Sequence, residues 1–321
     1  MTEGLYWGLP VVFYLFLAGM GAGALTVSSS VLLRGGGGGF AGAHLDIARY
    51  GAFLAPIPII VGAGLLVFEL GSFEAGHWFK WVNLWKVINL SPMSIGTWLL
   101  TLVIIVSIIY AYTFFRNAPG LGESRLRVRR LLAWVGVPLG ISVGVYTGVL
   151  LGAMPSRPFW NSPILALLFL LSSLSTGVAL ILLTRALLHR KSPDDESRRQ
   201  SQASAYLLTA TDMLLISFEL MIVFLFIMFA YLTVGDVRYA ISVLFEHGTL
   251  APLFWAGFVA LGLAVPVLIE LAFVARRLLY HKEYAAPRGV EILVSVVVLI
   301  GAFLLRYIVV VAGQITGPVG V

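Results

Sequence analysis

The stretch from Leu9 to Leu33 reads LPVVFYLFLAGMGAGALTVSSSVLL and contains no charged residue. A helix rises about 1.5 Å per residue, so this stretch is long enough to cross the roughly 30 Å hydrocarbon core of a bilayer. It is also longer than the ~7–15-residue apolar region of a cleavable signal peptide, and no basic region precedes it. We therefore predict that it is a retained first transmembrane helix.

The same composition extends over the rest of the chain. Charged residues make up 11% of the 321 residues and hydrophobic residues 60%, whereas a soluble domain has about 25% charged residues. Long apolar runs favour helices over the alternating strands of a membrane barrel. The eight segments that qualify as spans are Leu9–Leu33, Tyr50–Gly71, Ser94–Phe115, Leu131–Ala153, Ser162–Leu188, Ala205–Thr233, Pro252–Ala275 and Val290–Gly313. The predicted fold is an all-α integral membrane protein of eight transmembrane helices, arranged as two four-helix bundles in a single domain over residues 1–321.

The distribution of basic residues predicts how the spans are oriented. Sixteen lysines and arginines fall in the odd-numbered loops and four in the even-numbered loops. Because loops rich in Lys and Arg stay on the cytoplasmic side, both termini and the even-numbered loops are predicted to be extracytoplasmic. A bacterial protein of this kind is a multi-pass protein of the inner membrane. Membrane orientation also accounts for the net charge of +6, so we expect no nucleic-acid partner.

The residue types that hold redox metals are scarce or badly placed. The chain has no cysteine, which excludes cysteine-ligated iron–sulfur clusters within it. A transmembrane haem needs axial ligands, usually histidine, inside the helices. All five histidines lie in loops or at helix ends: His44, His77, His189, His247 and His281. We expect neither haem, nor an iron–sulfur cluster, nor another metal site in this chain.

Five ionisable residues fall inside the predicted spans, where each costs roughly 2.5–3.5 kcal/mol on insertion scales: Glu69, Asp212, Glu219, Glu270 and Arg306. Asp212 and Glu219 are seven residues apart and share one helical face. With Glu270 nearer the cytoplasm and Glu69 nearer the outside, they form a ladder of acids. One interpretation is a proton path through Asp212, Glu219 and Glu270. The other is structural, with Arg306 neutralising one acid and nearby Ser or Thr bonding the others.

Two tyrosines fall in the outer third of the membrane, Tyr14 on the first span and Tyr146 on the fourth. A phenol donates hydrogen bonds and takes part in proton transfer. Each is therefore a candidate ligand for a quinone carbonyl, and each is also a candidate interfacial anchor.

Several strings resemble one membrane-protein family. They are WGLPVVFYLFLAGMGAG at Trp7–Gly23, SPMSIG at Ser91–Gly96, YTGVLLG at Tyr146–Gly152, RPFWNSP at Arg157–Pro163, and LRYIVVVAGQ at Leu305–Gln314. Their content and order resemble the NrfD/PsrC family, the membrane subunits of polysulfide reductase, nitrite reductase and related complexes. The resemblance covers nearly the whole chain.

The resemblance implies an eight-helix oxidoreductase subunit that binds menaquinone or ubiquinone and has no redox metal of its own. It implies a ferredoxin-like partner subunit with four iron–sulfur clusters, a molybdopterin catalytic subunit beyond it, and a quinone site near the periplasmic face. Tyr146 matches a family tyrosine proposed to bond the quinone. Polysulfide-reductase members carry a histidine on the first helix, where this chain offers Tyr14. From their depth in the membrane we add Glu69 and Arg306. The catalytic candidates are then Tyr146, Tyr14 and Glu69, and the candidate quinone contacts are these three residues and Arg306.

Two other functions remain open at this point. The acid ladder suits a secondary transporter or a proton channel, although transporters carry broken helices at mid-membrane and the prolines here lie near helix ends or permit simple kinks. An inert anchor for a soluble enzyme is the third reading, and buried acids have no purpose in it.

Overall fold

The computed structural model describes residues 7–34, 42, 44–70, 82–86, 91–115, 123–188, 195–245, 248–280, 284 and 286–317. These residues form helices and no strand. The helices are α1 (Leu9–Arg34), α3 (Leu45–Leu54), α4 (Pro56–Leu70), α5 (Asn83–Lys86), α6 (Pro92–Phe115), α7 (Glu123–Gly152), α8 (Pro163–Leu188), α9 (Asp195–Leu232), α10 (Asp236–Ser242), α11 (Leu250–Pro252), the π-helical segment η2 (Leu253–Ala264), α12 (Val265–Tyr280) and α13 (Arg288–Ile315).

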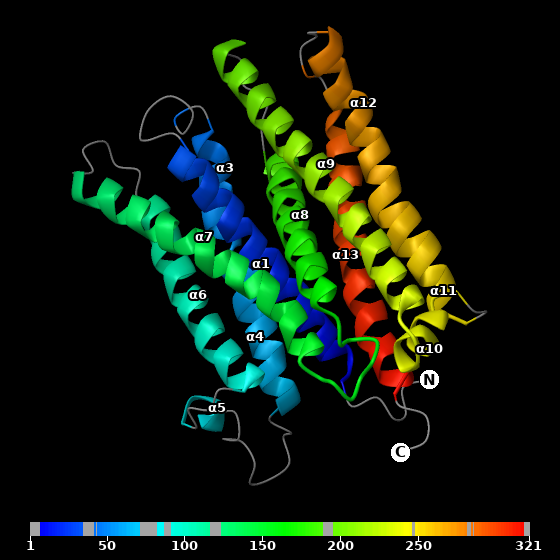
Figure 1. Ribbon diagram of the computed structural model, residues 1–321. Coiled ribbons are helices and arrows are strands. Elements are labelled where there is room, and N and C mark those ends of the chain that lie inside the picture. The colour runs from blue at the N-terminus through cyan, green and yellow to red at the C-terminus, as the bar shows by residue number, and fades with distance from the viewer. Residues whose placement is uncertain are drawn as a thin grey trace.

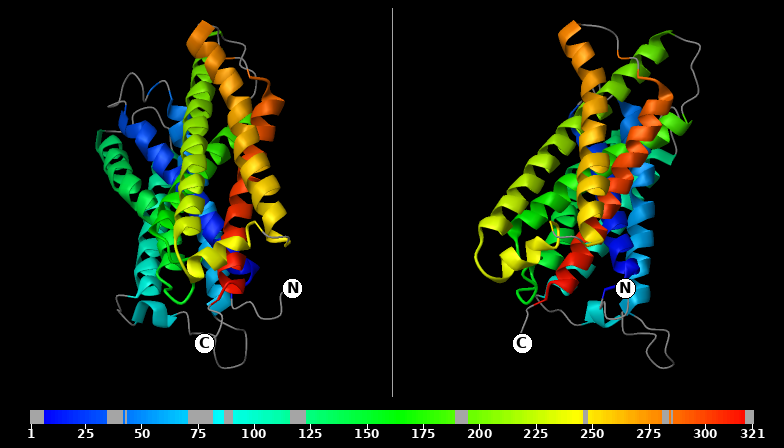
Figure 2. Two further views of the ribbon diagram at one scale, coloured as in Figure 1. Left: turned by 45° about the vertical axis from the view of Figure 1, so that its right-hand side comes forward. Right: turned by 90° about the vertical axis from the view of Figure 1, so that its right-hand side faces the viewer.

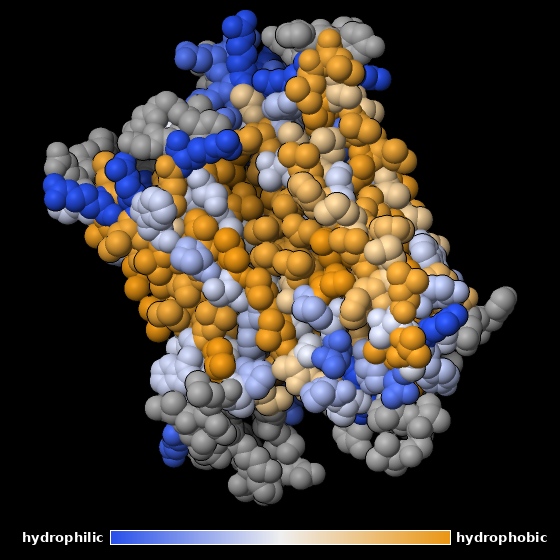
Figure 3. All heavy atoms as spheres, viewed as in Figure 1, coloured by the Kyte–Doolittle hydropathy of each residue, from blue (hydrophilic) through white to orange (hydrophobic). Residues whose placement is uncertain are grey.

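Eight of these helical stretches are long and apolar enough to cross a membrane, which confirms the predicted fold class. The second span joins α3 and α4, and the seventh joins α11, η2 and α12. Figure 3 shows the apolar side chains as a broad belt between two ends where hydrophilic residues gather. That distribution matches a protein whose middle is solvated by lipid.

Two helices begin well before the predicted start of their apolar spans. The fourth span was predicted from Leu131, but α7 begins at Glu123, and the sixth was predicted from Ala205, but α9 begins at Asp195. The added turns are rich in Arg, Glu and Gln, which are strong helix formers in water. Hydropathy finds only the part of a helix that lies in lipid, so it misses these polar extensions.

Helices α1 and α8 lie at the centre of the packing. Helix α1 contacts α4, α7, α8 and α13, and α8 also contacts α7, α9 and α13. Figures 1 and 2 show the tilted helices around this pair, with the start of α1 and the end of α13 at the same end of the molecule. The division into two four-helix bundles and the extracytoplasmic position of the termini stay predictions.

Small residues let α1 and α8 approach at backbone distance. A Cβ added to Gly23 would lie 1.8 Å from the carbonyl oxygen of Ser173, and one added to Gly177 would lie 2.3 Å from the carbonyl carbon of Gly23. Lipid tails are as apolar as the helix surfaces, so close packing of this kind drives association in membranes. The run of glycines in α1 is thus explained by packing.

We expect Gly23→Ala to destabilise the protein by about 1–3 kcal/mol, because the new methyl group overpacks a backbone contact that cannot rotate away. Gly64→Ala is the matched control, since Gly64 also lies in a span but a Cβ there meets nothing within 4 Å. Removing a helical glycine at an open position usually stabilises. Thermal unfolding in detergent measures both, and shifts of the same sign would contradict the packing argument.

Candidate functional site

The structure brings together Tyr14 of α1 and Tyr146 of α7. Tyr14 is fully buried and Tyr146 is 8% exposed, and their phenols are close enough to interact. Even so, the Tyr14 hydroxyl makes no hydrogen bond of acceptable geometry among the described residues. Buried phenols usually find a partner, so this hydroxyl has capacity for an additional polar group.

Helix α6 makes room for the Tyr146 ring at Gly96. A Cβ on Gly96 would lie 1.8 Å from the Tyr146 hydroxyl oxygen. Gly96, the last residue of the SPMSIG string, therefore packs directly against the phenol of Tyr146. The sequence analysis did not predict this role of Gly96, because a local motif does not show which distant side chain packs against a glycine.

Three of the motif strings meet at one end of the bundle. The Trp7 ring stacks on the Trp160 ring with centroids 5.3 Å apart. The Gln314 side chain accepts from the Trp7 backbone N–H at 2.9 Å and donates to the Trp7 carbonyl at 3.0 Å. Arg157 donates to the Gln314 carbonyl at 2.9 Å, and Trp160 to the Val309 carbonyl at 2.7 Å. These contacts fix the start of α1 against the end of α13.

Glu69 lies apart from the tyrosine pair. It is an exposed residue near the end of α4, and its carboxylate is 3.7 Å from the position of a Cβ on Gly8. Among the described residues, no hydrogen bond or ion pair joins it to Tyr14 or Tyr146. The structure thus places Glu69 near the start of α1 without bringing it to the candidate quinone contacts.

Arg306 of α13 is fully buried and most of its donors are engaged by the protein. Its guanidinium donates to the hydroxyls of Ser172 at 2.9 Å and Ser173 at 3.4 Å. It also donates to the carbonyls of Ala302 at 2.8 Å and Leu15 at 3.4 Å. Leu15 is the residue that follows Tyr14 in α1, so this contact brings the buried charge close to Tyr14. The two serine contacts connect the same guanidinium to α8.

Glu219 of α9 lies close to the same Ser172 hydroxyl. It is 2% exposed, and it interacts with Ser172, with Arg306 and with Asp212. Arg306 is thus the opposite charge nearest to this acid, as the structural interpretation of the sequence expected. Charges in the membrane interior are tolerated when they pair in this way.

Asp212 and Glu270 continue the chain of acids. One oxygen of Asp212 accepts from the Ser175 hydroxyl at 2.7 Å, and its other oxygen has no partner among the described residues. Glu270 of α12 is 2% exposed and interacts with Asp212. Neither oxygen of Glu270 has a hydrogen-bond partner in the same part of the chain. Glu270 is therefore buried against its neighbours in the described part of the chain.

A small pocket opens beside Glu270. Its polar lining consists of Glu270, Thr209, Tyr284 and Glu291. The Thr209 and Tyr284 hydroxyls are 2.8 Å apart, and burial raises the pKa of Tyr284, which lies outside the spans. About 10 Å³ of space is open to the centre of a water molecule, close to the ~10–15 Å³ that one water needs. Sequence reasoning missed Tyr284, which no periodic pattern marks.

A second polar cluster joins α3, α8 and α9 on the same side of the molecule. Arg185 forms an ion pair with Asp46 at 3.0 Å. The Ser204 hydroxyl donates to Asp46 at 3.2 Å and therefore accepts from Nδ1 of His44 at 2.8 Å. Burial lowers the pKa of His44, and Arg185 adds to that effect while Asp46 opposes it.

We expect this histidine to make the folded protein sensitive to acid. Its lowered pKa means that the unfolded chain binds the proton more tightly, so the stability present above the unfolded pKa of about 6.5 is lost as the pH falls through the folded pKa. Thermal unfolding from pH 7.5 to 5 measures the loss. His44→Gln keeps a side-chain donor and is expected to flatten the curve in this window; an unchanged slope would contradict the prediction.

Within the described ranges, no group of three His, Cys, Asp or Glu residues is arranged to hold a metal ion. What the structure assembles is an eight-span helical membrane protein with a buried tyrosine pair near one end and a chain of intramembrane acids leading toward the other. The chemistry of both features is that of proton donors and acceptors.

Comparison with known proteins places the chain among membrane subunits of reductases. Residues 1–318 match the family described as "Polysulphide reductase, NrfD". The chain is 31% identical to the C component of polysulfide reductase from Wolinella succinogenes, over 96% of this chain and 94% of that protein. It is 31% identical to protein NrfD of Escherichia coli, over 98% and 96%. It is 24% identical to the C component of selenate reductase from Mesobacillus selenatarsenatis, over 57% and 48%.

The chain therefore belongs to the NrfD family of polysulfide-reductase-type membrane subunits. The family resemblance of its motif strings is confirmed.

Proposed function

We propose that this chain is the quinone-binding membrane subunit of an oxidoreductase complex, with its site between α1 and α7. The observation that carries the proposal is the fully buried Tyr14 hydroxyl, which lies beside Tyr146 and lacks a hydrogen-bond partner of acceptable geometry. A quinone carbonyl is an acceptor of the right kind for either phenol. The family membership supports the assignment, since a polysulfide reductase subunit is among the relatives.

The tyrosines supply what the reaction requires of the protein. Menaquinone or ubiquinone, when bound, carries two electrons and two protons between its oxidised and reduced forms. Tyr146 and Tyr14 orient the headgroup by hydrogen bonds and receive or deliver protons at its carbonyl oxygens. Gly96 leaves space for the Tyr146 ring, and Glu69 stands at the same outer level as a proton acceptor toward water.

The electrons leave or arrive through partner subunits. Cysteine is absent from the sequence, so we assign the iron–sulfur clusters to a ferredoxin-like partner and the terminal reaction to a molybdopterin subunit. Two relatives are named as the C components of polysulfide and selenate reductases, which supports such an assembly. The excess of Lys and Arg in the odd-numbered loops supports an orientation with the tyrosine end of the bundle on the periplasmic face of the inner membrane, and we propose that the partner docks there.

We further propose that the buried acids conduct protons between the two faces. A chain of contacts starts near Tyr14, where Arg306 donates to the Leu15 carbonyl. Arg306 also contacts Ser172, and Ser172 interacts with Glu219. Asp212 and Glu270 continue toward the pocket with Tyr284 and Glu291. The unpartnered oxygens of Asp212 and Glu270 suit groups that accept and release a proton, because a permanently charged acid there would demand a fixed partner.

A secondary transporter or proton channel is the competing function, and it rests on the same acids. Transporter sites lie where helices unwind at mid-membrane. Here α7 continues through Pro138, and Ala55, between α3 and α4, keeps helical angles of φ −58° and ψ −50°. These continuous helices favour the oxidoreductase subunit.

Quinone binding is tested on the intact complex, solubilised with its native lipids. We expect about one menaquinone or ubiquinone per chain on extraction, and a photoreactive quinone analogue should label α1, α6 or α7 near Gly96. A complex without retained quinone, or labelling confined to the far side of the bundle on α12, overturns the proposal. Rapid proton flux through liposomes that contain this chain alone favours the channel instead.

A further inference from the structure

The pocket beside Glu270 lies where α8, α9, α12 and α13 converge. We propose that this pocket binds one water molecule, and that the water and the hydroxyls of Thr209 and Tyr284 pass protons between Glu270 and the solution. The inference rests on the proton path proposed above, and it assigns the groups that connect the last buried acid of that path to water.

Glu270 requires a partner in the pocket in either of its protonation states. It is 2% exposed, and neither of its carboxylate oxygens has a hydrogen-bond partner among the described residues. When the acid is ionised, two acceptors lack a donor, and when it is protonated, one donor lacks an acceptor. Buried polar groups are rarely left in this state, and ordered water is a common partner for them. A water molecule both donates and accepts, so it satisfies Glu270 in both states.

The size and the lining of the pocket fit a single water molecule. The space of about 10 Å³ is at the lower end of what one water needs, and a buried water makes about three hydrogen bonds. The polar groups around this space are two carboxylates and two hydroxyls, those of Glu270, Glu291, Thr209 and Tyr284. A divalent cation fits less well, because it takes six or more oxygen ligands and because the charge of Arg185 already acts on Glu291.

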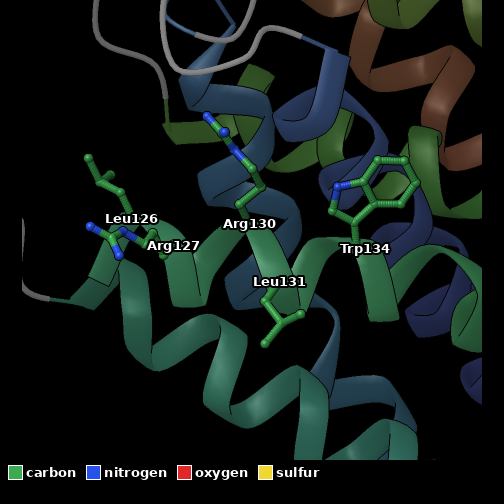
Figure 4. A pocket seen from close by; sticks show the side chains of 5 residues that line it. All are labelled: Leu126, Arg127, Arg130, Leu131 and Trp134. Atoms are coloured by element: carbon green, nitrogen blue, oxygen red, sulfur yellow. The ribbon is translucent and has the colours of Figure 1, made fainter. Parts of the chain in front are cut away.

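The larger pocket at the start of α7 differs in its burial. It has a volume of about 580 Å³, and the side chains that line it are all exposed: Leu126, Arg127, Arg130, Leu131 and Trp134 (Figure 4). Such an open surface does not isolate a polar group from its surroundings. The pocket beside Glu270 does, so a single water there has a defined chemical role.

The two hydroxyls connect the pocket to a less buried acid. The oxygen atoms of Thr209 and Tyr284 are 2.8 Å apart, and either hydroxyl can donate to the other. Glu291 interacts with Tyr284 and is half-buried, whereas Glu270 is buried. The Tyr284 ring makes an edge contact with the Tyr206 ring, with centroids 5.8 Å apart, which holds the phenol in place. The protonatable groups therefore extend from an enclosed carboxylate to one that solvent reaches.

Proton transfer along these groups balances at every step. Glu270 takes a proton from the water as the water takes one from a hydroxyl, and a proton from Glu291 restores that hydroxyl. Each group between the two acids loses one O–H bond and gains one. Burial raises the pKa of Tyr284, which disfavours a free phenolate and favours this exchange. The other charges that act on these groups are those of Asp212 on Glu270 and of Arg185 on Glu291 and Tyr284.

Proton uptake by the intact complex in proteoliposomes tests the proposal, with quinol as the electron source. Tyr284→Phe and Thr209→Val should each slow proton uptake by ~10²-fold or more, the lower end of what a positioned proton-transfer group contributes. Quinol oxidation in the presence of an uncoupler should keep its wild-type rate in both variants. Thr209→Ser keeps the hydroxyl and should keep most of the proton uptake, which a role in packing alone does not predict.

Tyr206→Phe and Thr211→Val are the matched controls. Tyr206 contacts the Tyr284 ring, and Thr211 donates to the Leu207 carbonyl at 2.7 Å, but neither lines the pocket. Both variants should take up protons at the wild-type rate. Losses in the controls as large as those in Tyr284→Phe overturn the proposal.

Asp212→Asn, measured in parallel, separates this inference from the proton path on which it rests. If Asp212→Asn stops proton uptake while Tyr284→Phe and Thr209→Val do not, the path stands and the water relay is wrong. If Asp212→Asn leaves proton uptake unchanged, both are wrong. A density map of the complex in lipid nanodiscs should show a water peak within about 3 Å of a Glu270 oxygen. The lack of that peak overturns the proposal, and a requirement for sodium over choline overturns it in favour of a bound cation.

Discussion

Tyr146→Phe is expected to slow quinol-dependent turnover of the complex by ~10²–10⁴-fold, the usual loss when a general acid or base is removed. The variant deletes one hydroxyl and keeps the ring that packs over Gly96, so the fold should persist. The measurement is steady-state oxidation of a soluble quinol analogue. In parallel, an artificial donor that reduces the partner subunits directly should give wild-type rates, because that reaction bypasses this chain.

Tyr14→Phe is expected to have opposite effects on stability and on turnover. The hydroxyl of Tyr14 is buried without a hydrogen bond of acceptable geometry. A buried polar group left unsatisfied costs about 1–3 kcal/mol. We therefore expect Tyr14→Phe to raise the stability of the quinone-free protein while it lowers quinol turnover. A stability gain with normal turnover would assign Tyr14 to the structure alone and remove it from the site.

Tyr110→Phe is the control for both variants. Tyr110 is also fully buried within a span, but its hydroxyl lies 3.2 Å from Ser28 Oγ. Removing it should reduce stability by about 1 kcal/mol, the usual contribution of a hydrogen bond, and leave quinol turnover unchanged. If Tyr110→Phe slows quinol turnover as much as Tyr146→Phe, the effect comes from packing rather than from the candidate site.

The sequence predicts the spans well because burial in lipid selects residues by composition alone. It also singles out Tyr14, Tyr146 and the intramembrane acids as candidate functional residues, since a polar residue is conspicuous in an apolar run. It does not predict the contacts between helices. That Gly96 lies under Tyr146, or that Glu270 faces Asp212, depends on which spans are neighbours, and no local pattern encodes this.

Glu69 shows that depth along a helix does not predict which residues are neighbours. Counting along the helix gives Glu69 a depth in the predicted span, but depth is one coordinate, and proximity to Tyr146 needs the other two. The exposed position of Glu69 beside Gly8 is decided by where α4 packs on α1. The sequence likewise places Arg306 inside the last span, but its burial and its serine and carbonyl partners became visible only in the packed helices.

Among the acids, Asp212 gives the cleanest test of proton conduction. Glu219 is the acid that interacts with Arg306, so its removal takes away a charge that offsets a buried cation and is expected to destabilise the protein. A loss of activity in that variant would report misfolding as readily as a blocked path. Asp212 has no such partner among the described residues; the Ser175 hydroxyl that it accepts from bonds equally well to an amide oxygen.

We expect Asp212→Asn to abolish proton movement across the membrane during turnover while electron transfer continues. An amide neither binds nor releases a proton in this pH range, so a path through residue 212 is interrupted. The measurement uses proteoliposomes with a pH-sensitive dye inside and quinol as the electron source. Protons per electron should fall to the number released by quinol itself, and an uncoupler should not change the electron-transfer rate of the variant.

Two variants separate this effect from a general disturbance. Asp236→Asn removes an exposed acid at the start of α10 and should leave the proton count at its wild-type value. Asp212→Glu restores a titrating group and should recover part of it. An unchanged proton count in Asp212→Asn would mean that the buried acids serve only to hold α8, α9 and α12 together. In that case the protons of quinol chemistry enter and leave at the tyrosine end alone. Among the described residues, the buried acids are the protonatable groups that connect the tyrosine pair to the pocket beside Glu270.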